Sequence, residues 1–443
     1  MKPAAPIYLD YNATTPLDPA VVEAMRPYQE IHFGNPSSGH VYGRAALAGV
    51  TTARAQVAAL LGCAPDEVVF TGGGSEADNQ ALIGVALAHR DRGDHLITTQ
   101  IEHPAVLETC RYLERRLGFH VTYLPVDQQG QVDPAAVAAA ITPRTLLISV
   151  MQANNETGVL QPIAAIAEIA RRRGVLMHTD AAQSVGKVPV DVAALGVDLL
   201  AVAGHKLYAP KGVGVLYVRR GTLLDPLIHG AGHEGGRRAG TENVAGIVGL
   251  GAACAVAQER LPTERPRLLA LRDRLEQALV AAGWERNGHP TERLPNTLNV
   301  SLTGAEGEAV LARAERRRLH RLGLPQRPHG AIGRAAGDGP AARAGAGRRA
   351  AHPGALDHGV RRGPRGRRAR GRRARRAGPA AGGPGGEGVS APSRPRGCGR
   401  GLAARRLRQG HRRWRCPVRE EGERDGEARH HVHHYLVSVL PNG

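Results

Sequence analysis

The sequence predicts an α/β fold in which helices cover both faces of a largely parallel sheet. Short apolar runs alternate with segments of helical periodicity over residues 7–255, which is typical of βαβ units. Polar clusters follow most of these runs, and ligands in such sheets bind beyond the carboxyl ends of the strands. The expected strands are Val68–Phe70, Leu96–Thr98, Val121–Tyr123, Leu146–Met151, Val175–His178 and Leu199–Ala203, and two clear helices cover 45–61 and 163–173.

The chain is expected to divide into four parts, which are an N-terminal arm at 1–14, a large domain at 15–255, the beginning of a smaller α/β domain at 256–314 and a tail at 315–443. The third part contains a helix at about 261–281 and a strand at 297–302 before it is cut short. The tail is rich in Arg, Gly, Ala and Pro and poor in Val, Ile, Phe and Tyr. It cannot bury enough apolar surface to offset its ordering entropy, so we expect it to be disordered.

The charge and the cysteines of the chain indicate which partners and metal sites to expect. The 443 residues carry a net charge of +19, which would ordinarily indicate a nucleic-acid partner, but the arginines crowd into the tail. The five cysteines form no CxxC pair, so neither a zinc site nor a disulfide framework is indicated. No signal-peptide pattern is present at the N-terminus, and no apolar run reaches membrane-spanning length. We therefore expect a cytoplasmic protein without a metal, a nucleic-acid partner or a membrane partner.

Lys206 lies in a tight Gly-His-Lys loop, residues 204–206, between two apolar strands. A lysine there can lose water, which lowers its pKa and favours the neutral amine that a Schiff base needs. Taken alone, the position fits an exposed loop lysine better.

Other polar residues follow strands in the same way. Asp180 stands where a buried strand ends, so its carboxylate could hold a pyridinium nitrogen protonated or cap a helix. The glycine turn at 72–74 leads into a helix that opens at Ser75, and its N–H groups suit a phosphate, although most such turns are only turns. His103 and Asn155 also follow strands, and either fits a loop residue whose hydrogen bonds are satisfied.

Three further segments complete a pattern. They are Tyr-Leu-Asp-Tyr-Asn-Ala-Thr-Thr-Pro at 8–16, Phe-Gly-Asn-Pro-Ser-Ser at 33–38 and Arg-Arg-Ala-Gly-Thr-Glu-Asn at 237–243. With the clusters above, they resemble the fold-type-I, pyridoxal phosphate-dependent enzymes of the class-V aminotransferase family. Within that family the chain looks most like the cysteine desulfurases of the nitrogen-fixation (NifS-like) type, and the resemblance runs from Tyr8 to about Leu311.

The resemblance implies a role for each cluster. Lys206 would hold pyridoxal phosphate covalently and move protons, and His103 would stack on the ring and act as acid or base. Asp180 would pair with the pyridine nitrogen, Gln183 with the ring hydroxyl, and Asn155 with cofactor and substrate. The phosphate would be bound by Gly74, Ser75, Ala203, His205 and Thr241 of the partner subunit.

Three positions depart mildly from the family pattern. Gly74 and Ser75 stand where Ala-Thr is usual, and Ala203 stands where Ser is usual. Ser75 keeps a hydroxyl group, whereas Ala203 loses one possible phosphate hydrogen bond, worth roughly 1–2 kcal/mol if it is charge-assisted.

The resemblance also implies an activity. A homodimer would convert L-cysteine to L-alanine, hold the sulfur as an enzyme persulfide, and pass it to an iron–sulfur scaffold protein and on towards nitrogenase clusters. That chemistry needs a nucleophilic cysteine on a mobile loop after residues 306–309, in a Ser-Gly-Ser-Ala-Cys-like context. The sequence has no such loop, so the chain as written is expected to bind the cofactor and to lack desulfurase activity. Cys398 and Cys416 lie too far downstream, and Cys63, Cys110 and Cys254 belong to helical or helix-flanking segments of the large domain.

We interpret the tail as the product of a one-nucleotide slip of the reading frame between about Ala312 and Arg318. GC-rich DNA that is read out of frame yields mostly Arg, Gly, Ala and Pro codons. Joining the last two bases of each codon to the first base of the next lets 318–326 read Val-Ser-Thr-Gly-Ser-Ala-Cys-His-Ser and 355–359 read Arg-Ser-Thr-Thr-Glu. The alternative is a true basic tail that binds nucleic acid. A second alternative is another enzyme of the same fold, such as a selenocysteine lyase or an aminotransferase.

Overall fold

The structure is a computed structural model that describes residues 7–305, 310 and 434–438. All of them belong to one compact unit. Its centre is a seven-stranded sheet in the order β1-β7-β6-β5-β4-β2-β3. Only β7 runs antiparallel to its neighbours, so the sheet is mixed and mostly parallel, as predicted. The strands are β1 Val68–Thr71, β2 His95–Thr99, β3 His120–Leu124, β4 Thr145–Ser149, β5 Leu176–Asp180, β6 Leu199–Ala203 and β7 Gly214–Val218.

Two apolar cores cover the two faces of this sheet. Adjacent strand residues alternate between them, because successive side chains of a strand point to opposite faces. Leu96 and Leu147 pack in one core with α3 and α4, and Ile97 and Ile148 pack in the other with α2, α5, α6 and α8. The helices are α1 Pro19–Glu30, α2 Val41–Leu61, α3 Gly74–Ala88, α4 Pro104–Leu117, α5 Pro134–Ala140, α6 Ile163–Arg172, α7 Val192–Leu195 and α8 Val244–Ala281.

The helix α8 is longer than the sequence predicts. The expected start near Leu261 is wrong, because the helix continues through Pro262 and Pro266. Prolines inside a helix cost about 3 kcal/mol each, whereas the buried residues of α8 lie mostly in its first half. A Cβ atom on Gly249 would lie 2.6 Å from the Met25 sulfur, so α8 approaches α1 as closely as only glycine permits. The predicted boundary between residues 255 and 256 falls inside this helix.

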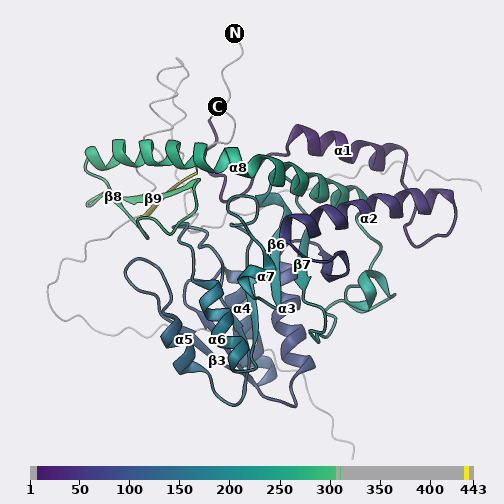
Figure 1. Ribbon diagram of the computed structural model, residues 1–443, viewed down its shortest axis with the longest axis horizontal. Helices are drawn as coiled ribbons and strands as arrows, with labels where there is room; N and C mark the ends of the chain where they lie inside the picture. Colours follow the sequence, from purple (N-terminus) through teal and green to yellow (C-terminus); the bar gives the residue numbers. More distant parts are fainter. Residues whose placement is uncertain (1–6, 306–309, 311–433, 439–443) are drawn as a thin grey trace, which may run out of the picture. The chain divides into compact units, whose positions relative to one another are not determined.

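Figure 1 shows α8 along the top of the molecule beside α1 and α2. Contrary to the sequence-based expectation, α8 is long and apolar enough to cross a membrane by length and composition alone. Its first half carries buried residues such as Ile247 and Leu250, and its neighbours are helices of the same core. We therefore interpret α8 as a core helix.

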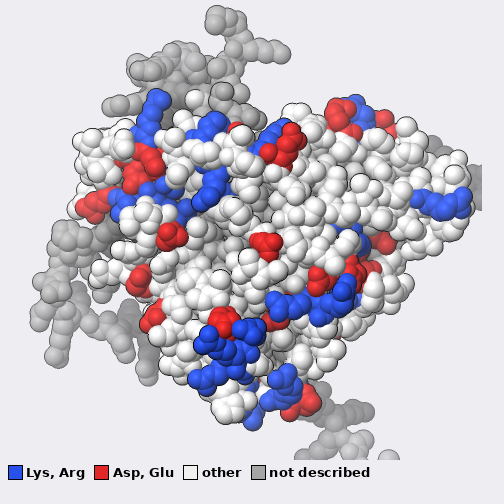
Figure 2. Space-filling view, viewed as in Figure 1, with Lys and Arg blue, Asp and Glu red and all other residues white. Residues whose placement is uncertain are grey.

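A second sheet lies beyond α8 in the chain and contains β8 Glu285–Arg286, β9 Thr297–Ser301 and β10 His434–Ser438, all antiparallel. The prediction of a wholly disordered tail is therefore wrong for residues 434–438. The alternation in His-Tyr-Leu-Val-Ser suits a strand, and the open edge of β9 supplies the hydrogen-bonding groups that it pairs with. The remainder of the predicted tail lies outside the described residues. Figure 2 shows acidic and basic side chains interspersed over the visible face of the described part.

Candidate active site

A cavity of about 640 Å³ lies beyond the carboxyl ends of the parallel strands. Nine of the ten residues that the sequence predicts for the site line it, namely Gly74, Ser75, His103, Asn155, Asp180, Gln183, Ala203, His205 and Lys206. The tenth, Thr241, lines a separate cavity of about 130 Å³. Gly72 and Gly212 line both cavities. Residues that are far apart in the sequence therefore meet, because strand ends of a parallel sheet share one edge.

Lys206 ends a short 3-10 helix, Gly204–Lys206, that follows β6 directly. Its amine donates a hydrogen bond to the backbone carbonyl of Asn12. The N-terminal segment holds this loop further, since the Thr15 N–H donates to the His205 carbonyl at 3.0 Å. Burial lowers the pKa of Lys206, and the nearby Asp10 and Asp180 oppose that shift. The lysine is therefore a partly desolvated amine that faces the cavity, not the exposed loop residue that the sequence also allowed.

Asp180 is the last residue of β5 and is buried. One carboxylate oxygen accepts the Ala182 N–H at 2.9 Å. Turn residues follow it rather than a helix, so the alternative of a helix cap does not apply. Burial raises the pKa of Asp180, whereas the Ala182 N–H and the nearby His103 and Lys206 side chains oppose that rise. A cationic nitrogen in the cavity would favour the ionised carboxylate further.

Gln183 is buried between a backbone carbonyl and a second lysine. Its amide donates to the Asn12 carbonyl at 3.0 Å, and its carbonyl accepts from Lys187 Nζ at 3.0 Å. Burial, together with the charge of Lys206, lowers the pKa of Lys187 to about 7. The sequence analysis missed Asn12 and Lys187. The available signals were the 8–16 pattern that contains Asn12 and a lysine within the apolar segment 185–190.

The glycine turn brings backbone N–H groups to the cavity. The helix α3 begins at Gly74 after the cap residue Gly73, whose φ is 150°, and the first N–H groups of a helix have no partner within it. The turn is packed closely on β6, because a Cβ atom on Gly74 would lie 3.0 Å from the Cβ of Ala203. These N–H groups and the positive end of the helix dipole form a site for an anion such as phosphate.

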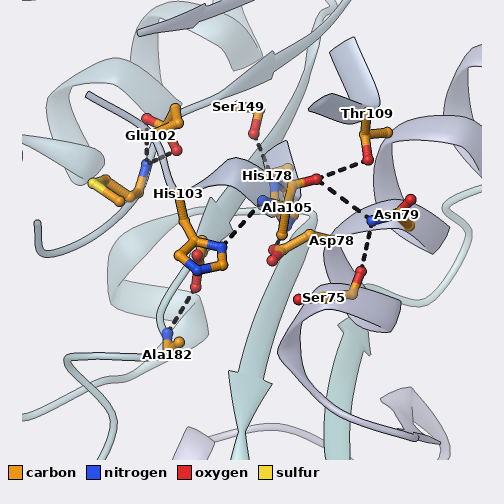
Figure 3. A network of polar contacts seen from close by, with 12 residues as sticks. Ser75, Asp78, Asn79, Glu102, His103, Ala105, Thr109, Ser149, His178 and Ala182 are labelled. Atoms are coloured by element: carbon orange, nitrogen blue, oxygen red, sulfur yellow. Dashed lines mark hydrogen bonds and ion pairs between the residues drawn. The ribbon is translucent and has the colours of Figure 1, made fainter. Parts of the chain in front are cut away.

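His103 and Asn155 also line the cavity. His103 caps α4, and its Nδ1 accepts the Ala105 N–H at 3.1 Å (Figure 3). That bond orients the ring and leaves Nε2 as the nitrogen that carries the proton in the neutral form. The backbone carbonyl of Asn155 accepts a hydrogen bond from the Asn12 side chain at 3.1 Å.

A buried polar network lies beside these residues, and no pattern in the sequence predicted it. The Ser149 hydroxyl contacts His178 Nδ1 at 2.9 Å, and His178 Nε2 lies 3.5 Å from Asp78 (Figure 3). Burial lowers the pKa of His178 to about 3. Burial, with the charges of Asp180 and Glu102, raises the pKa of Asp78 well above its ordinary value. Both shifts favour the uncharged forms of His178 and Asp78.

Glu102 gives the site a testable dependence on pH. Its carboxylate accepts the Thr99 hydroxyl at 2.7 Å and the Met151 N–H at 3.0 Å, but burial outweighs these bonds and raises its pKa from 4.5 to about 8. The folded protein then keeps a proton that the unfolded chain loses above pH 4.5. The stability from that proton is fully present below pH 4.5 and is lost as the pH rises through about 8.

We expect the wild type to lose on the order of 2–4 kcal/mol of unfolding free energy between pH 5 and pH 8 relative to Glu102→Gln. Urea titrations at several pH values measure this difference. Glu108→Gln is the matched control, because the Glu108 side chain is 62% exposed on α4. Parallel pH curves for the wild type and Glu102→Gln would contradict the protonated state of Glu102.

None of the described cysteines lines the cavity. Burial raises the pKa of Cys63, Cys110 and Cys254 to about 12 in each case. A thiol of that kind is protonated at neutral pH and is a poor nucleophile. Cys398 and Cys416 lie outside the described residues. Within the described ranges, no group of three or more His, Cys, Asp and Glu side chains is placed to hold a metal ion.

Comparison with known proteins places this site in a family. The class-V aminotransferase model matches residues 7–318. A cysteine desulfurase IscS of Methanosarcina thermophila is 50% identical over 306 residues, which cover 69% of this chain and 76% of the relative. A cysteine desulfurase of Nostoc is 50% identical over 307 residues, with the same coverage.

Solved structures agree with the sequence comparison. A NifS-like protein superposes with a TM-score of 0.68 at 38% identity and covers 72% of this chain and 87% of its own. A structure of SspA in complex with cysteine gives a TM-score of 0.63 at 39% identity and covers 70% of this chain and 86% of its own. The fold-type-I architecture predicted from the sequence is thus confirmed. The chain belongs to the class-V aminotransferase family, among its cysteine desulfurases.

Proposed function

We propose that this protein is a pyridoxal phosphate-dependent cysteine desulfurase, which converts L-cysteine to L-alanine and transfers the sulfur as a persulfide. One observation carries the proposal: a single cavity brings together Lys206, Asp180 and the glycine turn in a chain that is half identical to cysteine desulfurases.

The cavity residues fit pyridoxal phosphate at three points. The Lys206 amine is partly desolvated, as a covalent attachment requires. Asp180 has one carboxylate oxygen that takes part in no hydrogen bond with the described residues, and it can meet a ring nitrogen. The N–H groups from Gly74 onward suit the phosphate. Gln183, Asn155, Ala203 and His205 complete the walls.

When bound, pyridoxal phosphate supplies an electron sink for the charge that develops on the substrate α-carbon. The neutral Lys206 amine would take the proton from that carbon. His103 would hold or release a proton at Nε2, because its Nδ1 is occupied by the Ala105 N–H. Asp180 would keep the ring nitrogen protonated through its negative charge. The buried walls exclude water and hold these groups in fixed directions.

We place the missing sulfur nucleophile in the alternative reading frame. The family match ends at residue 318, and the alignment with the relatives stops after about three quarters of their length. Both facts support a slip of the frame near Ala314. In that case β8 and β9 would begin a small domain that the shifted codons complete, and residues 315–443, β10 included, would not be a native tail.

We also propose a cytoplasmic homodimer that donates sulfur to an iron–sulfur scaffold protein, with nitrogenase clusters as the final destination. Apolar side chains are exposed at the tip formed by α1 and α2, where Ile31 is 61%, Phe33 74% and Val41 63% exposed. Such a patch is typical of an interface between subunits. Thr241 lies outside the cofactor cavity of its own chain, which supports its assignment to the site of the partner subunit.

Ala203→Ser is expected to strengthen cofactor binding. The added hydroxyl would stand at the end of β6 beside the glycine turn, where it can donate to the phosphate. A charge-assisted hydrogen bond of roughly 1–2 kcal/mol predicts a roughly tenfold lower Kd for pyridoxal phosphate. Absorbance titration measures it, and Ala182→Ser, in the same cavity, is the control. An equal effect of both substitutions would argue against a phosphate at the glycine turn.

Product analysis separates this function from its nearest competitors. The frame-restored enzyme is incubated with L-cysteine, L-selenocysteine or an amino acid with a keto acid, and alanine, sulfide, selenide and new amino acids are measured. A desulfurase releases alanine from cysteine and needs no keto acid. Preferential use of selenocysteine would indicate a lyase, and keto-acid-dependent amino transfer would indicate an aminotransferase.

A further inference from the structure

The residues 229–243, which we call the Thr241 loop, connect β7 and its following turn to α8. Most of this loop is exposed, and its only regular element is the short turn of helix His233–Gly236. A loop of this length without regular structure is normally variable in position. Two ion pairs hold it in place here.

The first ion pair ties the loop to α2 and β1. The Glu234 carboxylate accepts two bonds from Arg54, at 2.7 and 2.8 Å, and a third from the Phe70 N–H at 2.9 Å. The Glu234 side chain is only 3% exposed. The Arg54 guanidinium also lies 4.7 Å from the centre of the Phe70 ring. Every donor that reaches this carboxylate comes from the strand that leads into the glycine turn or from the helix packed on it.

The backbone of the loop is strained at the same point. Glu234 has φ 50° and is followed by Gly235 at 65° and Gly236 at 81°. Left-handed backbone is disfavoured for a residue with a Cβ atom and persists only where surrounding contacts impose it. The three hydrogen bonds to the Glu234 carboxylate are those contacts.

The second ion pair ties the loop to the glycine turn itself. Arg238 donates to one oxygen of Glu76 at 2.8 Å, and the other oxygen of Glu76 accepts the Gly72 N–H at 2.9 Å. Gln80, one turn further along α3, donates to the Arg237 carbonyl at 2.8 Å. One carboxylate therefore fixes both the loop and the turn that would receive a phosphate.

We propose that Arg54 and Glu234 are positioning residues that hold the Thr241 loop as a rigid arm, so that it offers Thr241 to the cofactor phosphate bound by a second copy of this chain. This inference rests on the proposed function and on the proposed dimer. It assigns to the Arg54–Glu234 pair a role in phosphate recognition, which a purely stabilising ion pair would not have.

Two ligands separate the two roles. Pyridoxal phosphate and pyridoxal share the aldehyde and the ring and differ only in the phosphate. If the Arg54–Glu234 pair, which we call the clamp, merely stabilises the fold, Glu234→Gln weakens the binding of both ligands alike. If the clamp positions a group that donates a hydrogen bond to the phosphate, the same change raises the Kd of pyridoxal phosphate roughly tenfold, as the loss of one charge-assisted hydrogen bond predicts. The Kd of pyridoxal then changes by less than about twofold.

The experiment titrates both ligands into the full-length wild type, Glu234→Gln and Arg54→Lys. Arg54→Lys keeps the charge and loses the two-pronged geometry, so it tests the clamp even if Glu234→Gln does not fold. Arg144→Met is the matched control, because it removes another two-pronged pair, with Asp94, whose arginine side chain is 67% exposed. Equal losses for both ligands, or no loss, overturn the inference. Failure of the wild type to bind pyridoxal phosphate overturns the proposed function instead.

Mixed dimers test which chain receives the arm. In the first dimer, one chain carries Lys206→Ala and the other carries Glu234→Gln. The one Lys206 left in the dimer is then in the Glu234→Gln chain, and the Thr241 loop that reaches it comes from the other chain and is intact. In the second dimer, one chain carries both substitutions and the other is wild type. The one Lys206 left is in the wild-type chain, and the Thr241 loop that reaches it carries Glu234→Gln. We expect tight binding of pyridoxal phosphate in the first and roughly tenfold weaker binding in the second. The reverse order would show that the loop serves its own chain and would overturn the proposal.

Discussion

Restoring the alternative reading frame after Ala314 is expected to turn a chain that releases no sulfide from L-cysteine into an active desulfurase. The restored codons supply a cysteine on a loop, whereas Cys110 and Cys254 are buried, Cys63 is half-buried, and all three thiols have a raised pKa. Loss of a nucleophile costs on the order of 10³-fold or more in turnover. A methylene-blue assay for sulfide, with alanine measured in parallel, compares the two chains.

The control is the restored chain in which the cysteine codon that spans Leu324 and Pro325 is replaced by a serine codon. It should bind pyridoxal phosphate as the restored chain does and release no sulfide. Robust desulfuration by the chain as written, with its cofactor bound, would refute the frame slip. Independent sequencing of the gene across residues 312–318 tests the same point at the level of DNA.

Lys206→Ala is expected to abolish the covalent attachment of the cofactor. Without the amine, the protein loses the visible absorbance of the lysine-bound form, and its Kd for pyridoxal phosphate rises roughly 100-fold or more, since both the covalent bond and a buried contact are lost. Absorbance titration after extensive dialysis measures both effects. Lys211→Ala is the matched control, because Lys211 lines the same cavity on the next turn of the chain. Similar losses in both variants would mean that general positive charge, not attachment at Lys206, retains the cofactor.

The sheet and most of the site could be predicted from the sequence, because both follow from local patterns. Buried parallel strands are continuous apolar runs, so β1 to β6 stood out within one or two residues. Lys206, Asp180 and His103 follow those runs directly, and strand ends meet at one edge. The glycine turn before Ser75 marks a helix start by its composition alone.

The features that the sequence did not reveal depend on packing between distant segments. The Asn12 carbonyl accepts a hydrogen bond from the Lys206 amine across 194 residues, and the 8–16 pattern that contains Asn12 does not reveal this contact. The start of α8 was hidden because prolines are helix breakers by composition, whereas Pro262 and Pro266 both lie inside this helix. The pairing of β10 with β9 joins Ser301 to His434, a separation that single-sequence periodicity cannot bridge. The clamp between Arg54 and Glu234 likewise exists only in three dimensions.

Borohydride reduction of the full-length chain after incubation with pyridoxal phosphate, followed by peptide mapping, tests the proposed site most directly. Reduction fixes the cofactor on whichever amine holds it. The structure offers two buried candidates, Lys206 in the cavity and Lys187 behind Gln183, and burial lowers the pKa of both. We expect one pyridoxyl group per chain on Lys206, lost in Lys206→Ala. Labelling of Lys187 instead, or no stable label on a correctly folded protein, would contradict the site described above.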